Sequence, residues 1–442
     1  MKLKEVTESL IGETLILNGW VLTARFQSQI TFIKMTDGSN DGIQIVCDFS
    51  PSVTIGTSIQ AKGILVKSPS SEQKYELSCN SIEIIGTSED YPLAKSKMSL
   101  EYLRKFPHLR NRTSSYSSIF RIKSAISFAT HLFYHSRGFI HLNPNIITVN
   151  ECEGGAGVFQ ITEKDITFPN KLIMDQNKYD WKTDHFGKPV YLTVSSQLQL
   201  EALACSLGAV YTTNKSFRSE HSSTNKHLSE FEHLEIENTF ITLNELMQIG
   251  EDYIKYIASY LLENNMSDIQ ILSKFVSKGL LERIQTISST SFNRITYNEA
   301  IPLLEGKIKH GEDLSSECEH FLTEYFKGPV FVYNWPSSIK SFYMYQNGDG
   351  TCSNFDLLMP YKVGELIGGS MREERYDVLV DMMKKKGVEP SSLQFYLDLR
   401  KYGSVPHGGF GLGLDRMCML FTGMENIKDV VTFPIYYGQC EF

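Results

Sequence analysis

Two segments of the chain place charged residues and glycines in spacings that suit a bound nucleotide. The first, residues 216–237, reads SFRSEHSSTNKHLSEFEHLEIE. Arg218 and Glu220 are two residues apart, so they face the same side if the segment is a strand, and His227 and Phe231 follow a polar stretch. Because arginine binds a phosphate with two hydrogen bonds and phenylalanine stacks on a base, the segment favours a nucleotide clamp. The alternative is a surface Arg/Glu pair beside a core phenylalanine.

The second segment, residues 407–423, reads HGGFGLGLDRMCMLFTG. Its glycines allow a ligand to approach the backbone closely, and Arg416 follows in an apolar helical run, where it can bind a terminal phosphate. The segment lacks the GK[ST] ending of a P-loop, so a Walker-type ATPase is not supported.

A third segment, FDLLMPYKVGELIGGSMREER, places Asp356 and Glu365 in apolar, strand-like surroundings. Carboxylates in such surroundings are rarely unpaired, and magnesium on a nucleotide is a natural partner for them. The alternative is a buried ion pair with Arg372 or Arg375.

The elements that must position these residues indicate an α+β chain. Residues 13–86 contain about five short strands, with turn signals at Asp37-Gly38 and Asp41-Gly42. This pattern predicts a small β-barrel of the OB kind, a fold that often binds oligonucleotides, with an SH3-like domain as the alternative. The later chain mixes helical and strand-like runs, which indicates a second domain on a mainly antiparallel sheet.

Several segments of this second domain have a predicted structure. Residues 117–139 carry apolar residues at a helical period and predict a helix that ends at Arg137-Gly138, and an extended segment with Pro144 at an edge position follows over residues 140–149. The remaining predictions are helices over 198–207 and 245–264 and strands over 329–334 and 341–346.

The composition excludes several classes of protein. With 12% aromatic residues and only 14 prolines among 442 residues, the chain is neither disordered nor fibrous. Its net charge of −8 argues against binding nucleic acid by bulk electrostatics alone. The eight cysteines show no CxxC pair or zinc-ligand spacing, and no stretch resembles a signal peptide or a membrane span. We therefore expect a cytoplasmic protein that contacts no membrane.

One stretch is locally basic. Residues 98–124 contain six basic side chains and one acidic side chain, at the junction between the expected barrel and the second domain. A polyanion could lie across this junction. A solvated linker explains the charge equally well.

In this order, the segments resemble class II aminoacyl-tRNA synthetases, and most closely the asparaginyl-tRNA synthetases. The long helix and the Pro144 segment are similar to the first motif of the class, which forms a homodimer interface, FRSE…HLSEF to the second and GFGLGLDR to the third. More specific strings are LRNRT, CEGG, LTVSSQLQLEAL, IKSFYM, IGGSMREER and YLDLRKYGSVPHGGFGLG. The resemblance covers nearly the whole chain and implies an OB-fold anticodon-binding domain over 1–97, a basic hinge over 98–115 and a class II catalytic domain over 116–442.

The resemblance implies an asparagine–tRNA ligase, which uses ATP to turn L-asparagine into asparaginyl-adenylate and then transfers the asparagine to the 3′ end of its tRNA. Arg218 would bind the α-phosphate, Phe231 would stack on adenine, and Arg416 would reach the γ-phosphate. The residues implied to bind ATP are Arg218, Glu220, Lys226, His227, Phe231, Glu365 and Arg416, of which Arg218, Glu220 and Arg416 are the catalytic ones. The residues implied to hold Mg²⁺ are Asp356 and Glu365.

The same resemblance implies an amino-acid pocket and an anticodon site. Aspartyl enzymes have a lysine where this chain has Leu200, and the carboxylate of the next residue, Glu201, can accept a hydrogen bond from an amide and repel an aspartate. The alternative for Glu201 is a salt-bridged helix residue. The pocket residues implied are Glu153, Ser195, Gln197, Glu201 and Arg372. The residues implied to grip the central anticodon base are Arg25, Phe32 and Gln44.

The chain departs from the family pattern at three places, namely Gly157-Val158, Ser196 and Met371. Two alternative functions are an aspartyl-tRNA synthetase and a stand-alone amide ligase that makes asparagine from aspartate. The latter has no need of an anticodon barrel, and its substrate also requires a cation near Leu200. A non-catalytic relative would be expected to have lost at least one of Arg218, Glu220, Asp356, Glu365 and Arg416.

Overall fold

The chain forms two compact units that are described separately. The first unit is Met1–Lys123 with Asn265–Lys278, and the second is Ser124–Asn264 with Gly279–Phe442. The computed structural model describes residues 1–28, 30–70, 73–94, 98–149, 157–165, 167, 174–175, 178–222 and 224–441.

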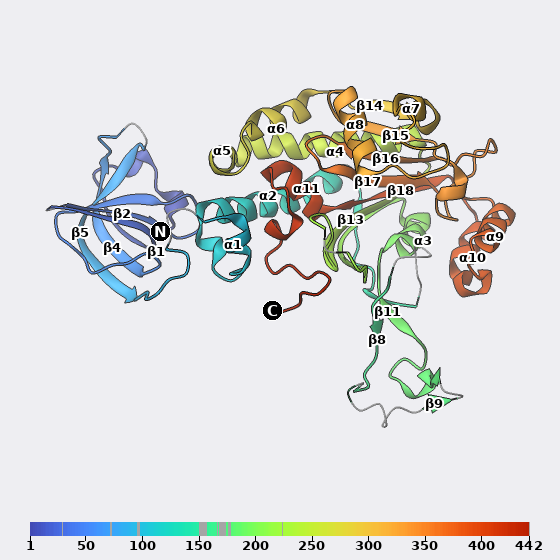
Figure 1. Ribbon diagram of the computed structural model, residues 1–442, viewed down its shortest axis with the longest axis horizontal. Coiled ribbons are helices and arrows are strands. Elements are labelled where there is room, and N and C mark those ends of the chain that lie inside the picture. Colours follow the sequence, from blue (N-terminus) through green and yellow to red (C-terminus); the bar gives the residue numbers. More distant parts are fainter. Residues whose placement is uncertain are drawn as a thin grey trace. The chain divides into compact units, whose positions relative to one another are not determined.

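The first unit contains a closed β-barrel (Figure 1). Its strands are β1 (Thr14–Gln27), β2 (Ile30–Thr36), β3 (Ile43–Cys47), β4 (Ser58–Lys67) and β5 (Tyr75–Gly86), in the order β1-β2-β3-β5-β4. Alternate residues such as Leu17, Ile33 and Ile45 are fully buried, because successive side chains of a strand point to opposite faces. The five-stranded closed barrel confirms the predicted OB fold and excludes the SH3-like alternative.

Several cations of the basic junction have structural partners within this unit. Arg110 is fully buried and its guanidinium lies 4.6 Å from the centre of the Tyr116 ring. Arg121 forms an ion pair of 2.6 Å with Asp268, which lies on α5 (Met266–Phe275). The junction also contains the short helix α1 (Leu100–Arg104). Part of the local basic charge is therefore explained by packing and is not free to hold a polyanion.

The second unit is built on an eight-stranded sheet in the order β14-β15-β16-β17-β18-β13-β12-β6. Neighbouring strands are antiparallel except for the β14–β15 and β12–β6 pairs, as predicted for a mainly antiparallel sheet. The strands are β6 (Ile140–His141), β12 (Ala209–Phe217), β13 (Glu230–Thr239), β14 (Asn293–Thr296), β15 (Val330–Tyr333), β16 (Asn354–Met359), β17 (Gly364–Met371) and β18 (His407–Gly413).

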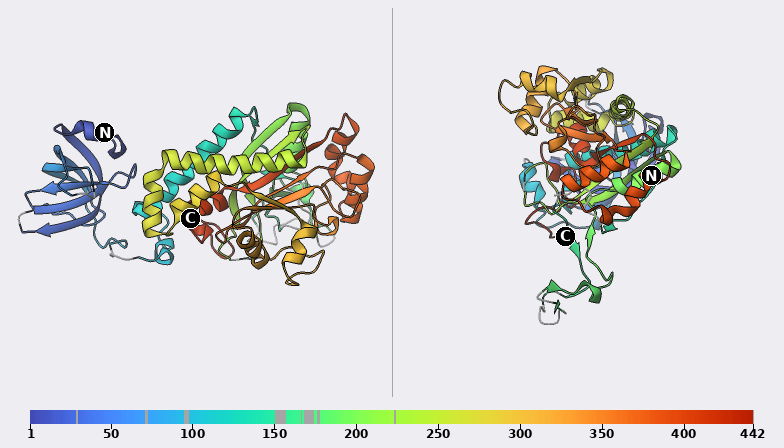
Figure 2. Two further views of the ribbon diagram at one scale, coloured as in Figure 1. Left: turned by 90° about the horizontal axis from the view of Figure 1, so that it is seen from above. Right: turned by 90° about the vertical axis from the view of Figure 1, so that its right-hand side faces the viewer.

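Helices pack against this sheet. The longest helix of this unit is α4 (Leu243–Asn264), which runs along one side of the sheet as the yellow-green helix of Figure 2. A Cβ at its Gly250 would lie 3.4 Å from Ile367 on β17, an ordinary van der Waals distance, so α4 packs directly on the sheet. The other helices are α2 (Ser114–Ser136, shared by both units), α3 (Gln197–Leu207), α6 (Leu280–Ser289), α7 (Tyr297–Leu303), α8 (Ser316–Tyr325), α9 (Tyr376–Lys385), α10 (Gln394–Lys401) and α11 (Leu414–Thr422).

The predicted helices are confirmed as α2, α3 and α4, and Gly138 follows α2 with a positive φ of 80°, as expected of a glycine that ends a helix. The extended Pro144 segment is confirmed as two short edge strands, β6 and β7 (Ile147–Thr148), on either side of a proline that lacks a backbone donor. One strand prediction is wrong. Residues 341–346 form a turn with isolated bridges, because the adjacent Phe342 and Tyr343 are both buried and cannot alternate between two faces.

A small sheet and a hairpin complete the second unit. β7 and β8 (Gln160–Ile161) pair with β11 (Val190–Leu192), and β9 (Met174–Asp175) pairs with β10 (Lys178–Tyr179). Among the described residues, no helix combines the length and the apolar character needed to cross a membrane. The seven described cysteines are free thiols.

Candidate active site

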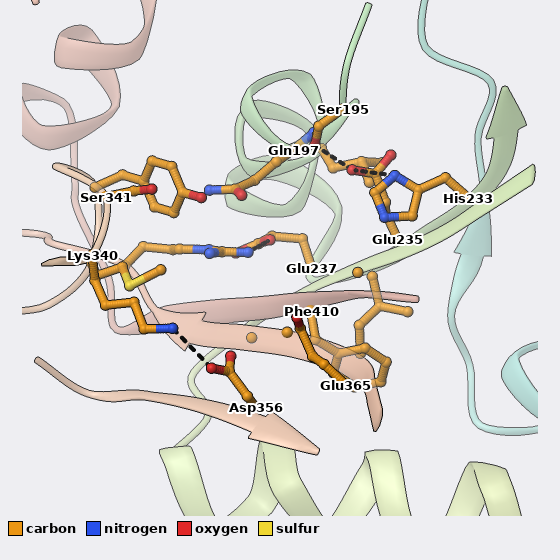
Figure 3. A pocket seen from close by; sticks show the side chains of 18 of the residues that line it. Ser195, Gln197, His233, Glu235, Glu237, Lys340, Ser341, Asp356, Glu365 and Phe410 are labelled. Atoms are coloured by element: carbon orange, nitrogen blue, oxygen red, sulfur yellow. Dashed lines mark hydrogen bonds and ion pairs between the residues drawn. The ribbon is translucent and has the colours of Figure 1, made fainter. Parts of the chain in front are cut away.

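The side chains on one face of strand β13 form much of one wall of the candidate site. Because side chains alternate along a strand, Phe231, His233, Glu235 and Glu237 face the same side, and all four line a cavity. Leu234, which lies between them on the opposite face, is fully buried. Figure 3 shows His233, Glu235 and Glu237 together on this wall. The alternation in the sequence EFEHLEIE therefore collects an aromatic ring, an imidazole and two carboxylates.

The glycines of β18 make room for these side chains. A Cβ at Gly409 would lie 2.1 Å from Glu237 Oε2, and a Cβ at Gly411 would lie 2.6 Å from His233 Nε2. Both distances are far below a normal van der Waals contact, so any larger residue would push a wall residue out of place. The sequence predicted that a ligand approaches these glycines closely. In the structure, side chains of the neighbouring strand β13 approach Gly409 and Gly411.

Two adjoining cavities open on this wall, one of about 400 Å³ and one of about 180 Å³. They share five lining residues, namely Arg218, His233, Glu365, Gly368 and Gly411. Arg218 thus lies where the two cavities meet.

The smaller cavity collects the residues predicted for ATP. It is lined by Arg218, Glu220, Lys226, His227, Phe231, Glu365 and Arg416, with other residues of the same segments. The guanidinium of Arg218 lies 5.4 Å from the centre of the Phe231 ring, and His227 Nε2 lies 3.8 Å from Glu220 Oε2. Residues 218–220 lie beyond the end of β12 and are not in a strand, so the strand spacing does not explain why Arg218 and Glu220 line the same cavity.

The floor of the larger cavity carries two neighbouring carboxylates, Asp356 on β16 and Glu365 on β17 (Figure 3). Asp356 Oδ2 accepts a hydrogen bond of 2.8 Å from Lys340 Nζ, whose other side faces the ring of Trp335. Burial raises the pKa of Asp356 to about 6, although Lys340 acts in the opposite direction.

The space between these carboxylates is kept open by a glycine. A Cβ at Gly368 would lie 3.0 Å from Glu365 Oε1 and 3.7 Å from Asp356 Oδ1. No group of three or more His, Cys, Asp or Glu side chains suited to a metal ion occurs among the described residues. Two carboxylates beside an open space fit a magnesium ion that arrives with a nucleotide and keeps phosphate and water ligands.

The other end of the larger cavity carries a buried ion pair. Arg372 Nε and one terminal nitrogen donate to the two oxygens of Glu237, each over 2.9 Å, and the other terminal nitrogen donates to Ser370 Oγ over 2.7 Å. Burial alone would lower the pKa of Arg372, but Glu237 outweighs it and raises this pKa, so Arg372 stays charged.

A second carboxylate of this wall is held by backbone and hydroxyl donors. Ser195 Oγ donates to Glu235, and the Ser196 backbone nitrogen donates to Glu235 Oε2 over 2.9 Å. Ser195 and Gln197, both predicted for the amino-acid pocket, line the same cavity. Ser196, where the family pattern has glycine, is fully buried and contributes its backbone N–H here.

The structure separates Glu201 from its neighbour Leu200. Leu200 lines the larger cavity, as expected for the position that distinguishes aspartyl enzymes. Glu201 is completely buried and is not among the described lining residues. It forms ion pairs with Arg400 and His407 at 2.9 Å and 3.1 Å.

Glu153 lies outside the described residues, so the structure gives no position for this predicted ligand of the ammonium group. Gly157, the next described residue, packs on the segment that begins at Arg218. The backbone nitrogen of Ser219 donates to the Gly157 carbonyl over 2.8 Å, and a Cβ at Gly157 would lie 2.6 Å from Ser219 Oγ. The departure at Gly157-Val158 therefore places a glycine where a side chain has no room. Met371, the third departure, packs against Gly408, where a Cβ would lie 3.0 Å from its sulfur.

Several site residues were not predicted. The β13 residues His233, Glu235 and Glu237 could have been found from their alternation with Phe231. Lys340, Ser341 and Tyr343 line the larger cavity from a turn, and no periodic signal in the sequence marks them.

The residues predicted for the anticodon share the outer face of the barrel. Arg25 on β1 pairs directly opposite Phe32 on β2, and Gln44 lies on the adjacent strand β3. Phe32 and Gln44 are half-buried between fully or nearly fully buried neighbours, so their side chains point outward. Gln44 Nε2 donates to Glu76 over 3.0 Å.

The chain belongs to the family described as tRNA synthetases class II (D, K and N), which matches residues 99–436. Residues 15–85 match the family described as OB-fold nucleic acid binding domain.

Within this family, the chain is similar to proteins named asparagine–tRNA ligase. It is 42% identical to that of Protochlamydia amoebophila, covering 98% of this chain and 97% of the relative, and 41% identical to that of Geotalea uraniireducens, covering 98% and 96%. The crystal structure of asparaginyl-tRNA synthetase from Pyrococcus horikoshii complexed with asparaginyl-adenylate matches with a TM-score of 0.88 at 30% identity, covering 100% of this chain and 99% of that chain.

The buried ion pair of Arg372 and Glu237 at the larger cavity gives a testable prediction. Arg372→Met would leave Glu237 buried without its cation and should cost about 3–5 kcal/mol in the free energy of unfolding. The exposed pair of Lys385 and Asp381 provides a matched control, since Lys385→Met should cost less than about 1 kcal/mol. Chemical denaturation of both variants measures the difference, and equal small losses would contradict a tightly coupled pair.

Proposed function

We propose that this chain is an asparagine–tRNA ligase. It joins L-asparagine and ATP to form asparaginyl-adenylate and pyrophosphate, and then transfers asparagine to the 3′ end of its tRNA. The full-length similarity to asparagine–tRNA ligases and the two adjoining cavities support this function. Formation of an adenylate needs positioning and charge neutralisation more than a covalent nucleophile, and the site offers those properties.

The observation that carries the choice of asparagine is the charge around Arg372. Its positive charge is already balanced by Glu237 over two hydrogen bonds, and Glu235 lines the same wall. A second carboxylate on the substrate would therefore face a wall that is not positive overall. A neutral carboxamide fits better, because its oxygen can accept a hydrogen bond from Arg372 without adding charge.

The nucleotide residues have distinct proposed roles. Arg218, where the cavities meet, neutralises the α-phosphate and holds the carboxylate that attacks it. Phe231 stacks on adenine while Glu220 binds its polar edge. Arg416 closes over the base and neutralises the leaving phosphates. Lys226 and His227 line the same cavity and contribute donors to those phosphates.

We also propose that Asp356 and Glu365 hold magnesium, which would supply positive charge to the phosphates. Lys340 pairs with Asp356 in this structure and is the cation nearest to that carboxylate among the described contacts. Magnesium at Asp356 would replace this contact, and Lys340 would then turn toward a phosphate or carboxylate oxygen of the substrates.

The domains proposed from the sequence have separate tasks. Residues 1–97 form the anticodon-binding domain, 98–115 a hinge and 116–442 the catalytic domain. Phe32 stacks on the central anticodon base, and Gln44 and Arg25 bind its edge and backbone. We expect the enzyme to work in the cytoplasm.

We further propose a homodimer that uses the outer face of α2. Ile126 and Ala129 of this helix are buried in their own chain, whereas Phe128 and Leu132 are 59% and 39% exposed. Ile140, Ile147 and Val149 are also exposed apolar residues of this unit. A two-fold partner would cover them with the same surface.

Substrate choice is tested by ATP/pyrophosphate exchange with each amino acid supplied separately. We expect asparagine-dependent exchange, with aspartate at least about 100-fold worse, because its carboxylate would be poorly neutralised beside Glu235 and Glu237. Comparable exchange with both amino acids would contradict asparagine specificity. Formation of free asparagine from aspartate without tRNA would indicate the amide ligase instead.

Arg218→Ala should lose about 3 kcal/mol or more of transition-state stabilisation, the scale of other preorganised charge contacts. The measurement is kcat/KM for exchange on protein whose thermal unfolding is normal. Arg283 also lies over an aromatic ring, that of Tyr361, but outside both cavities, so Arg283→Ala should retain exchange. Near-normal exchange by a folded Arg218→Ala would contradict the proposed role of Arg218 at the α-phosphate.

Phe32→Ala should raise the KM for tRNA by an amount equivalent to about 1–3 kcal/mol of lost stacking. Exchange without tRNA should remain near the unmodified level, because Phe32 lies on the barrel. Ile85→Ala removes another exposed apolar side chain, on β5, and serves as the control. If Phe32→Ala lowers exchange as much as charging, then Phe32 supports the fold and not the anticodon.

Light scattering should give about twice the chain mass of 50.3 kDa. Phe128→Glu places a charge on the proposed interface and should lower the mass and the exchange activity together. Tyr402→Glu changes a residue that is 80% exposed at the C-terminal end of α10, and it should lower neither the mass nor the exchange activity. A fully active monomer would overturn the dimer proposal.

A further inference from the structure

A buried carboxylate lies behind the wall of the larger cavity. Glu201 on α3 has no exposed surface, and four side chains donate hydrogen bonds to it. Gln197 Nε2 and the Tyr396 hydroxyl bind Oε1 over 3.0 Å and 2.9 Å. Arg400 and His407 bind Oε2 over 2.9 Å and 3.1 Å. With both oxygens taken, Glu201 has little capacity left for a substrate.

This arrangement fixes the orientation of one cavity residue. An ionised carboxylate only accepts hydrogen bonds, so the group that Gln197 turns toward Glu201 must be its NH₂. The Gln197 oxygen then points away from Glu201, on a side chain that lines the larger cavity. The hydrogen-bond network around Glu201 therefore decides the orientation of the Gln197 amide.

The partners of Glu201 are themselves held firmly. Arg400 is buried on α10 and also donates to the Tyr396 hydroxyl and to the Glu373 carbonyl, each over 2.9 Å. His407 Nδ1 lies 2.8 Å from the Val405 carbonyl. Burial alone would raise the pKa of Glu201, but Arg400, His407 and Arg372 outweigh it and lower this pKa, so the group remains a carboxylate.

Glu201 also lies close to Arg372, the arginine proposed to bind the side-chain oxygen of asparagine. Arg372 Nε lies 3.7 Å from Glu201 Oε1, the oxygen that Gln197 binds. Gln197 and Arg372 therefore stand side by side, one offering an acceptor and the other a donor to the cavity. That pair matches a ligand that presents both an N–H and an oxygen.

We propose that Glu201 is a positioning residue that acts through Gln197. It holds the Gln197 carboxamide so that its oxygen accepts a hydrogen bond from an N–H of the bound amino acid. This inference rests on the proposed asparagine activation. The N–H belongs either to the α-ammonium group or to the side-chain carboxamide, and aspartate carries only the first of these.

A double-mutant cycle of Glu201→Gln and Gln197→Met tests the inference in the full-length enzyme. Glu201→Gln lets the neighbouring amide turn over and should raise the KM for asparagine about tenfold, the scale of one hydrogen bond, with kcat and the KM for ATP little changed. In the Gln197→Met background, Glu201→Gln should have almost no further effect on the KM for asparagine.

The controls separate positioning from general support of the fold. Glu251 is another buried carboxylate, paired with Lys255 on α4, and Glu251→Gln should leave the KM for asparagine unchanged. If Glu201→Gln does not fold, Tyr396→Phe replaces it, with a smaller rise in KM that again disappears in the Gln197→Met background. Competition by aspartate identifies the N–H, because weaker discrimination indicates the carboxamide and equal weakening of both ligands indicates the ammonium.

Additive effects in the cycle, an equal rise in the KM for ATP, or an unchanged KM for asparagine would overturn the inference. The proposed function fails separately, through the absence of asparagine-dependent exchange in the unmodified enzyme.

Discussion

The ion pair of Arg372 and Glu237 depends on a glycine between them. The pair joins the end of β17 to β13 across the intervening strand β18, and Gly409 of that strand leaves the space that Glu237 occupies. A charge pair with almost no exposure is stable only when its geometry and its remaining hydrogen bonds are satisfied. The same contact therefore links β17 to β13 and forms part of the polar wall of the cavity.

The remaining electrostatics of the site follow the same pattern. Several of its acids are paired before any substrate is present, Glu237 with Arg372, Glu235 with serine donors, and Glu201 with Arg400 and His407. Such preorganised groups do not need to reorient when charge moves between substrates. We infer that the enzyme meets the cost of burying these charges during folding and not during the reaction.

Much of the fold could be predicted from the sequence, because periodic patterns report which face of an element is buried. The five barrel strands and the helices α2, α3 and α4 were predicted in this way. The strand predicted over 341–346 is wrong, because the adjacent Phe342 and Tyr343 are both buried in a turn. A run of hydrophobic residues does not by itself distinguish a buried turn from a strand.

The predicted nucleotide residues lie together at the two cavities, although a loop and not a strand brings Arg218 near Glu220. Glu201 shows the limit of reasoning from a position in a motif. Its neighbour Leu200 reaches the cavity, but whether the next side chain on a helix does so depends on α10 and β18, far along the chain. Lys340 carried no periodic signal, because a turn places it and turns have no period; only the string IKSFYM marked its segment.

The meeting of the two cavities at Arg218 has a consequence for inhibitor design. Under the proposed function, a single compound that joins an asparagine-like head to an adenine-like ring would occupy both spaces, and the second group would bind with the advantage of a high local concentration. Replacing the phosphate by an uncharged, non-hydrolysable link would forfeit part of the contact with Arg218 but retain the shape of both ends. The tightness of such a compound would depend on the fit of its link as much as on either end group.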